Sequence, residues 1–180
     1  VGLDYWVSGY GTGGTVSGVG RVLREKSPGT KIILTEPENA ALIGSELKQD
    51  RHSDNTPATS HSSWNPHLIQ GWTPDFIPFV LQEAIDNNYF NKLLPVSGEQ
   101  GITWAKRLAR AEGIITGISG GSTFAIAMEV AKDAPPDSNI LCMLPDTGER
   151  YLSSPLFEEI PEEMTDDEKK ISLSTPNYQL

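Results

Sequence analysis

The sequence contains a single cysteine, Cys142, among 180 residues. One cysteine excludes an intramolecular disulfide and any metal site built from several cysteines. Basic residues are also scarce: 14 Lys and Arg stand against 24 Asp and Glu, which gives a formal net charge of −10. This balance argues against nucleic acid or an anionic membrane surface as a partner, because both need a basic face. No apolar run approaches the roughly 18 residues that cross a bilayer.

The remaining composition is that of one folded, loop-rich domain, with 37% hydrophobic residues, 17 Gly and 13 Pro. Apolar runs that suit strands alternate with stretches that have helical spacing. Such alternation predicts an α/β domain with a mainly parallel sheet. The predicted strands cover 3–7, 31–35, 114–118 and 140–144, and the predicted helices 16–26, 76–90, 98–112 and 123–132. Residues 97–100 have the spacing of a capping box.

Two polar regions stand apart from this pattern. Residues 45–66 read as a long surface loop, for which a functional role and a tolerated insertion stay equally open. We therefore divide the chain into residues 1–157, with that loop as an insertion, and an acidic tail over 158–180. Thr165 to Glu168 predict one short, exposed, capped helix in the tail, whose acidic side chains we interpret as a solvated face.

A glycine-rich turn lies between the first strand and the first helix, over residues 9–15. Glycines let a backbone approach an anion closely, and a helix N-terminus offers free N–H groups. The spacing of Gly9, Gly11 and Gly14, with Glu36 placed for a ribose hydroxyl, would also suit NAD. Hydroxyls at Thr12 and Thr15 favour a compact terminal phosphate instead.

A second glycine-rich turn is predicted over Ser119 to Ser122, again between a strand and a helix. The carboxyl ends of parallel strands lie at one edge of a sheet. The two turns therefore suggest the two ends of one ligand, with Ser119 placed to hydrogen-bond a ring nitrogen.

Several motifs in order resemble the cysteine synthase and cystathionine β-synthase family of fold-type II pyridoxal-phosphate enzymes. Residues 11–15 are similar to the family's phosphate loop. Residues 67–71 are similar to its H-K-I-Q-G segment, and residues 148–153 to its G-E-R-Y-L-S signature. The resemblance implies the three-layer fold of the tryptophan synthase β family. It also implies pyridoxal 5′-phosphate as cofactor.

The resemblance also implies roles for individual residues. The cofactor phosphate would be held by Gly11, Thr12, Gly13, Gly14 and Thr15. Ser119 would face the pyridine nitrogen and leave it unprotonated, with Pro145 and Asp146 beside the ring. The mouth of the substrate pocket would be lined by Gln70, Gly71 and Trp72. No metal site is expected: the three histidines lack metal-ligand spacing, and His52 and His61 are interpreted as solvated loop residues.

The implied reaction is β-replacement, in which O-acetylserine and sulfide give cysteine and acetate. The segment 119–122 looks more like cystathionine β-synthase, and Trp72 replaces a small aliphatic residue, so condensation of serine with a thiol stays open. An NAD-dependent oxidoreductase and a catalytically inactive binding homologue are further alternatives. The resemblance implies a homodimer in cysteine biosynthesis and raises binding of serine acetyltransferase. We expect a cytoplasmic protein, with organellar targeting upstream of Val1 left open.

No lysine of this sequence lies in a context that matches the family's Schiff-base lysine. The eight lysines include Lys26 and Lys31, at the far end of the first predicted helix, and Lys169 and Lys170 in the tail. We therefore expect that the sequence is the C-terminal half of the enzyme, that its catalytic lysine lies upstream, and that this half is inactive alone.

Overall fold

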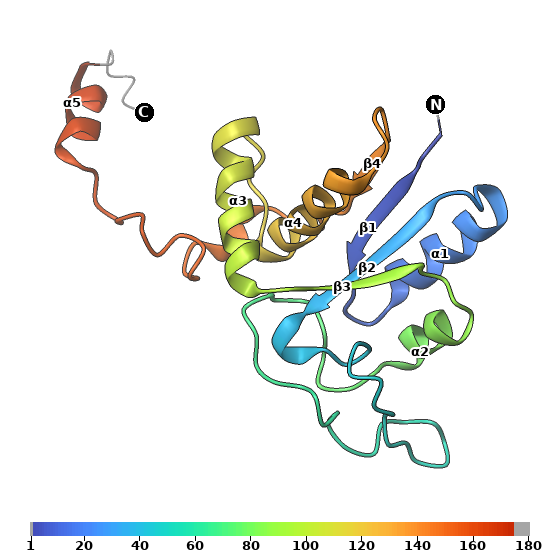
Figure 1. Ribbon diagram of the computed structural model, residues 1–180. Coiled ribbons are helices and arrows are strands. Elements are labelled where there is room, and N and C mark those ends of the chain that lie inside the picture. Colours follow the sequence, from blue (N-terminus) through green and yellow to red (C-terminus); the bar gives the residue numbers. More distant parts are fainter. Residues whose placement is uncertain (1, 175–180) are drawn as a thin grey trace.

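The computed structural model of the protein describes residues 2–174. Its core is a parallel sheet of four strands in the order β3-β2-β1-β4 (Figure 1). The strands are β1 (Tyr5–Gly9), β2 (Lys31–Pro37), β3 (Lys92–Val96) and β4 (Ile140–Cys142). The predicted α/β fold with a parallel sheet is confirmed. The last six residues of the predicted tail lie outside the described residues.

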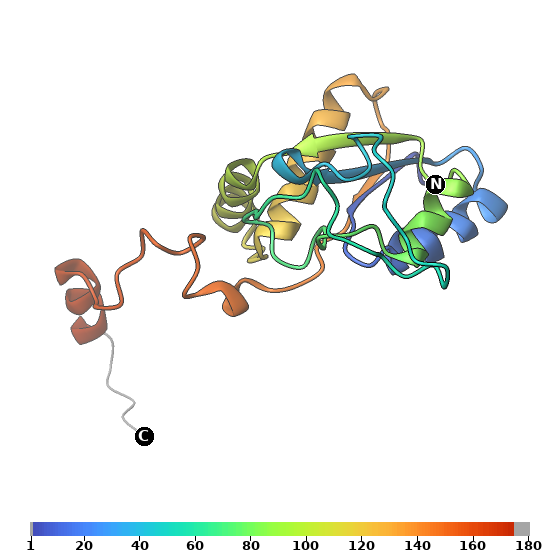
Figure 2. The same cartoon turned by 90° about the horizontal axis from the view of Figure 1, so that it is seen from below.

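Helices cover both faces of the sheet, which makes three layers (Figures 1 and 2). Successive side chains of a strand point to opposite faces, so Trp6 of β1 packs toward α1 (Gly14–Lys26) and α2 (Phe79–Asp86). Tyr5 and Val7 of the same strand pack on the other face, in a core shared with α3 (Gly98–Glu112) and α4 (Ile118–Asp133).

The predicted capping box at the start of α3 is present. Ser97 Oγ accepts a hydrogen bond from the Gln100 backbone N–H at 3.0 Å, and Gln100 Oε1 accepts one from the Ser97 N–H at 3.0 Å. Gly113 ends the helix with φ of 70°, a left-handed conformation that glycine adopts without strain. The local signals in this segment therefore predicted both ends of the helix.

The second glycine-rich segment is not a turn, and the strand predicted over 114–118 is wrong. Residues 114–117 are irregular, and α4 begins at Ile118, so that Ser119 to Ser122 form its first turns. The glycines serve helix packing: a Cβ on Gly121 would lie 2.0 Å from the carbonyl oxygen of Gly101 in α3. Glycine there lets the backbones of α3 and α4 approach each other closely.

Strand β3 was not predicted from the sequence, and the helix predicted over 76–90 is shorter than expected. Pro78 precedes α2, which starts at Phe79 and ends at Asp86. Pro95 lies within β3, where it faces Glu36 in the register. Proline weakens a strand signal, yet an edge strand tolerates it because one side of that strand has no ladder partner.

The loop over residues 45–66 contains no helix or strand, as predicted, beyond an isolated bridge between Arg51 and Pro57. His52 is exposed, but the interpretation of His61 as a solvated residue is wrong. The His61 side chain is buried, with Nε2 at 3.2 Å from the Leu47 carbonyl oxygen and Nδ1 accepting the Ser63 N–H at 3.2 Å. The His61 side chain thus connects residues 47 and 63 of the loop through hydrogen bonds.

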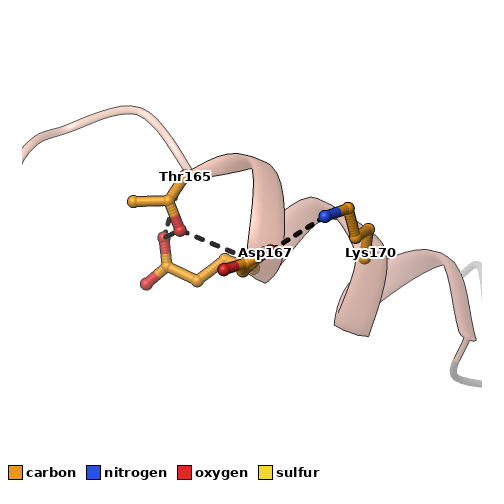
Figure 3. A network of polar contacts seen from close by, with 4 residues as sticks. Thr165, Asp167 and Lys170 are labelled. Carbon is orange, nitrogen blue, oxygen red and sulfur yellow. Dashed lines mark hydrogen bonds and ion pairs between the residues drawn. The ribbon is translucent and has the colours of Figure 1, made fainter.

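The acidic tail leads away from the layered domain and carries α5 (Asp166–Ser174), as Figures 1 and 2 show. Glu168 Oε2 accepts the Thr165 backbone N–H at 2.7 Å, and Thr165 Oγ1 accepts the Glu168 backbone N–H at 3.3 Å, which confirms the predicted capping box. An ion pair between Asp167 and Lys170 spans the first turn (Figure 3). In the part of the chain that is described, no helix is long and apolar enough to cross a membrane.

Candidate active site

A cavity of about 480 Å³ opens where the N-termini of α1 and α4 meet beyond the carboxyl ends of β1 and β4. This is the edge at which open parallel sheets bind their ligands. The structure brings most of the predicted site residues to its wall: Gly11, Thr15, Gln70, Gly71, Trp72, Ser119, Pro145 and Asp146. Thr12, Gly13 and Gly14 lie in the same loop but not among the residues that line the cavity.

The N-terminus of α1 has the properties of an anion site. Gly13 is the N-cap residue, with φ of 89°, and the first turn contains no acidic side chain. The first intrahelical bond runs from the Ser17 N–H to the Gly13 carbonyl at 2.9 Å. The N–H groups of Gly14, Thr15 and Val16 therefore have no acceptor within the helix, and the positive end of the helix dipole adds to their attraction for an anion.

At two positions of this loop, neighbouring atoms leave no room for a side chain larger than that of glycine. A Cβ on Gly11 would lie 2.5 Å from the Gly71 carbonyl oxygen, and one on Gly13 would lie 2.6 Å from Leu81 Cα in α2. Gly14 is exposed, and a Cβ at that residue would lie no closer than 3.8 Å to Thr12 Oγ1, its nearest neighbour. The loop therefore packs against Gly71 and against α2, while Gly14 at the start of α1 stays exposed.

The opposite end of the cavity is formed by the first turn of α4. Ser119 lies there with only 2% of its surface exposed. The N-cap residue of α4 is Gly117, whose backbone N–H donates to Asp146 Oδ1 at 3.2 Å. Asp146 also accepts the hydroxyl proton of Tyr151 through Oδ2. The residues that follow β4 are thereby tied to the start of α4.

Trp72 covers the end of β1. A Cβ on Gly9 would lie 2.0 Å from two atoms of the Trp72 indole, so the ring occupies the place where a side chain of residue 9 would be. The indole is half-buried and packs against the core on the α3 and α4 side of the sheet. Trp72 therefore lines the cavity and at the same time packs against the core.

Glu36 is not available to a ribose. It is 1% exposed, Tyr10 donates to its Oε2 at 2.5 Å, and the Gly44 N–H donates to its Oε1 at 2.8 Å. The Ile43 N–H donates to Oε2 as well, at 3.1 Å. Burial raises the pKa of Glu36 and, together with the Glu36 charge, that of Tyr10 far above its ordinary value. The NAD interpretation therefore fails at the residue on which it depended.

Further residues of the cavity wall were not predicted as site residues, namely Ser8, Gly9, Thr123, Met143, Arg150 and Tyr151. Arg150 and Tyr151 belong to the G-E-R-Y-L-S signature, which indicates the family but predicts no role for either side chain. No lysine is among the residues that line this cavity. Within residues 2–174 no cluster of His, Cys, Asp and Glu could hold a metal ion.

Comparison with known proteins decides the family. The family described as "Pyridoxal-phosphate dependent enzyme" matches residues 1–146. The chain belongs to this family. It is 39% identical over 173 residues to an O-ureido-L-serine synthase of Streptomyces lavendulae, an alignment that covers 96% of this chain and 47% of that protein. It is 34% identical to a cysteine synthase of Staphylococcus aureus, over 86% of this chain and 44% of the relative.

Solved structures agree with the sequence comparison. A crystal structure of O-ureido-L-serine synthase superposes with a TM-score of 0.76 at 38% identity, covering 94% of this chain and 47% of the other. The cysteine synthase of Entamoeba histolytica gives 0.70 at 31% identity, covering 91% and 42%. The chain thus spans about half the length of the relatives it matches, and its fold is that of fold-type II pyridoxal-phosphate enzymes.

The cavity fits the cofactor of this family. The unpaired N–H groups of α1 suit a phosphate dianion, and the Ser119 hydroxyl at the other end can exchange a hydrogen bond with a ring nitrogen. When bound, pyridoxal phosphate supplies an electron sink for carbanion chemistry. The residues of this chain would hold its phosphate, orient its ring and border the space for substrate.

Proposed function

We propose that this chain forms the cofactor-binding part of an enzyme that replaces the β-substituent of an O-acylated serine, with O-acetylserine and sulfide giving cysteine and acetate. The observation that carries the proposal is the cavity that joins the phosphate loop at α1 to Ser119 at α4. The phosphate loop and Ser119 would hold the two ends of a flat ligand, which sets the direction of its long axis in the cavity. A cysteine synthase among the relatives supports sulfide as the nucleophile.

An oxygen nucleophile is the second candidate, because one relative is an O-ureido-L-serine synthase. That product name places a ureido group on the serine oxygen, which corresponds to replacement by N-hydroxyurea. Condensation of serine with a larger thiol is a third possibility within the same chemistry. We propose further that the working enzyme is a homodimer; a contact with serine acetyltransferase is an extension of the same proposal.

We also propose that the 180-residue chain is inactive alone. A Schiff base needs a positioned amine, and no lysine lines the cavity of the described chain. The N-terminal half of the same enzyme, supplied in the same chain or as a second chain, would provide that amine and exclude water.

The first measurement is equilibrium binding of pyridoxine 5′-phosphate, which has no aldehyde, to the 180-residue chain. We expect saturable binding that inorganic phosphate displaces. The second is product analysis by mass spectrometry after mixing O-acetylserine with sulfide or N-hydroxyurea, with and without the N-terminal half. Cysteine or O-ureido-L-serine should form only in the reconstituted enzyme. Turnover by the chain alone, lost on mutation of one of its own lysines, would contradict this account.

A further inference from the structure

Glu36 is a buried carboxylic acid that lies outside the cavity wall. Its Oε2 accepts the Tyr10 hydroxyl at 2.5 Å and the Ile43 N–H at 3.1 Å, and its Oε1 accepts the Gly44 N–H at 2.8 Å. A Cβ on Gly44 would lie 2.6 Å from Oε1, so glycine there lets the backbone reach the carboxylate. Burying a carboxylate costs free energy unless hydrogen bonds satisfy it. Three donors meet that requirement here, and one of them, Tyr10, belongs to the glycine-rich loop.

Tyr10 is the only large side chain in the glycine-rich loop over residues 9–15. Its neighbours Gly9 and Gly11 line the cavity, whereas its own side chain is buried and packs into the hydrophobic core on the α1 and α2 side of the sheet. Glycine restricts a backbone little, so the shape of the loop depends on this ring and on the bond that its hydroxyl makes. Burial, followed by the Glu36 charge, holds the pKa of Tyr10 far above its ordinary value, so the hydroxyl keeps the proton that it donates.

The Tyr10 backbone also joins the loop to the segment that contains Gly71, a second part of the cavity wall. The Tyr10 carbonyl oxygen accepts the Thr73 N–H at 2.9 Å, and a Cβ on Gly11 would lie 2.5 Å from the Gly71 carbonyl oxygen. Thr73 has φ of 38°, a value that is rare for a β-branched residue, and its carbonyl oxygen accepts the Trp64 indole N–H at 3.1 Å. Contacts on both sides therefore hold this segment in place, and a shift of Tyr10 would move two parts of the cavity wall.

We propose that Glu36 and Tyr10 are positioning residues, which hold the glycine-rich loop in the shape that presents the N–H groups of α1 to a phosphate. This role rests on the proposed function, in which that phosphate belongs to the cofactor. Neither side chain lines the cavity, so the effect of both passes through the loop backbone. Donors that are already in place bind an anion more tightly, because little conformational entropy is lost in ordering them.

The test is equilibrium binding of pyridoxine 5′-phosphate to the folded 180-residue chain, together with the inhibition constant of inorganic phosphate as a competitor. Tyr10→Phe keeps the ring in the core and removes the bond to Glu36. We expect both constants to rise about tenfold, since a hydrogen bond to a charged group no longer fixes the loop. Glu36→Gln should act in the same direction, because its amide would bring N–H donors to a site lined by donors. The double variant should lose little more than either single one, because both side chains act through one bond.

Tyr89→Phe is the matched control. Tyr89 packs against the same hydrophobic core but lies outside the loop and the cavity wall, so its variant should bind both ligands with parental affinity. A purely structural role of Tyr10 would lower the thermal midpoint and leave the affinity of the folded protein unchanged. Parental affinity in folded Tyr10→Phe protein, or losses that add fully in the double variant, would overturn this proposal alone; if one single variant does not fold, the other decides. Absence of binding to the parent chain would overturn the proposed function and this proposal with it.

Discussion

The two glycine-rich segments of this chain look alike in sequence and do different things in the structure. Residues 9–15 leave the N-terminus of α1 open at the cavity, whereas Gly120 and Gly121 are buried inside α4 against neighbouring backbone and Thr116. The first segment leaves backbone N–H groups free at the start of α1, where an anion could accept from them, and the glycines of the second let two helices pack closely. A glycine cluster at the start of a helix therefore does not by itself mark a phosphate site.

The largest expected effect is on folding, at Gly121. Gly121→Val would place a side chain 2.0 Å from the Gly101 carbonyl oxygen and 2.7 Å from the Ala105 nitrogen. Backbone atoms cannot swing away, so we expect a loss of about 3 kcal/mol in the free energy of unfolding. Urea unfolding followed by circular dichroism measures it. An unchanged midpoint would show that α3 and α4 do not pack this closely.

An intermediate effect is expected on cofactor affinity, at Gly13. Gly13→Val directs its side chain at Leu81 of α2 and should displace the phosphate loop, which weakens pyridoxine 5′-phosphate binding more than tenfold through loss of one or two charge-assisted hydrogen bonds of about 1.5–3 kcal/mol each. The variant is also destabilised, because φ is 89° and Leu81 Cα lies 2.6 Å from the added Cβ.

Leu81→Ala provides the control for that loss of stability. Leu81 is fully buried against the same loop, so its truncation should cost about 2–5 kcal/mol of stability. Folded Leu81→Ala protein should nevertheless bind the ligand with nearly parental affinity. Equal loss of affinity in both variants would mean that Gly13 acts only through stability.

The smallest expected effect has the opposite sign, at Gly18. This residue lies within α1, and a Cβ there would meet no atom within 4 Å. Gly18→Ala should therefore raise the free energy of unfolding by about 0.5–1 kcal/mol, because alanine loses less backbone entropy in a helix. A lower thermal midpoint would reveal a contact at Gly18 that the structure lacks.

The sequence predicted the features that depend on local chemistry. Capping residues at Ser97 and Thr165 fixed the starts of α3 and α5, and the motifs named most of the cavity wall. It did not predict that Ser119 lies within a helix, because glycines usually indicate a turn, whereas here Gly121 packs against Gly101 of another helix. Nor could it predict the burial of His61 or the bonds of Glu36, because these depend on how irregular loop segments fold back on themselves and, for Glu36, on Tyr10 of a separate segment.

The pairing of β1 with β4 has a consequence for how the chain folds. The Asn139 backbone N–H donates to Asp4 Oδ2 across a separation of 135 residues, and Tyr5 lies opposite Ile140. Strand β1, near the start of the described chain, therefore pairs on one side with β4, which lies far along the sequence. Contacts so distant in sequence slow folding and leave strand edges unpaired in the meantime. During synthesis, β1 can complete its place in the sheet only after residue 142 has left the ribosome.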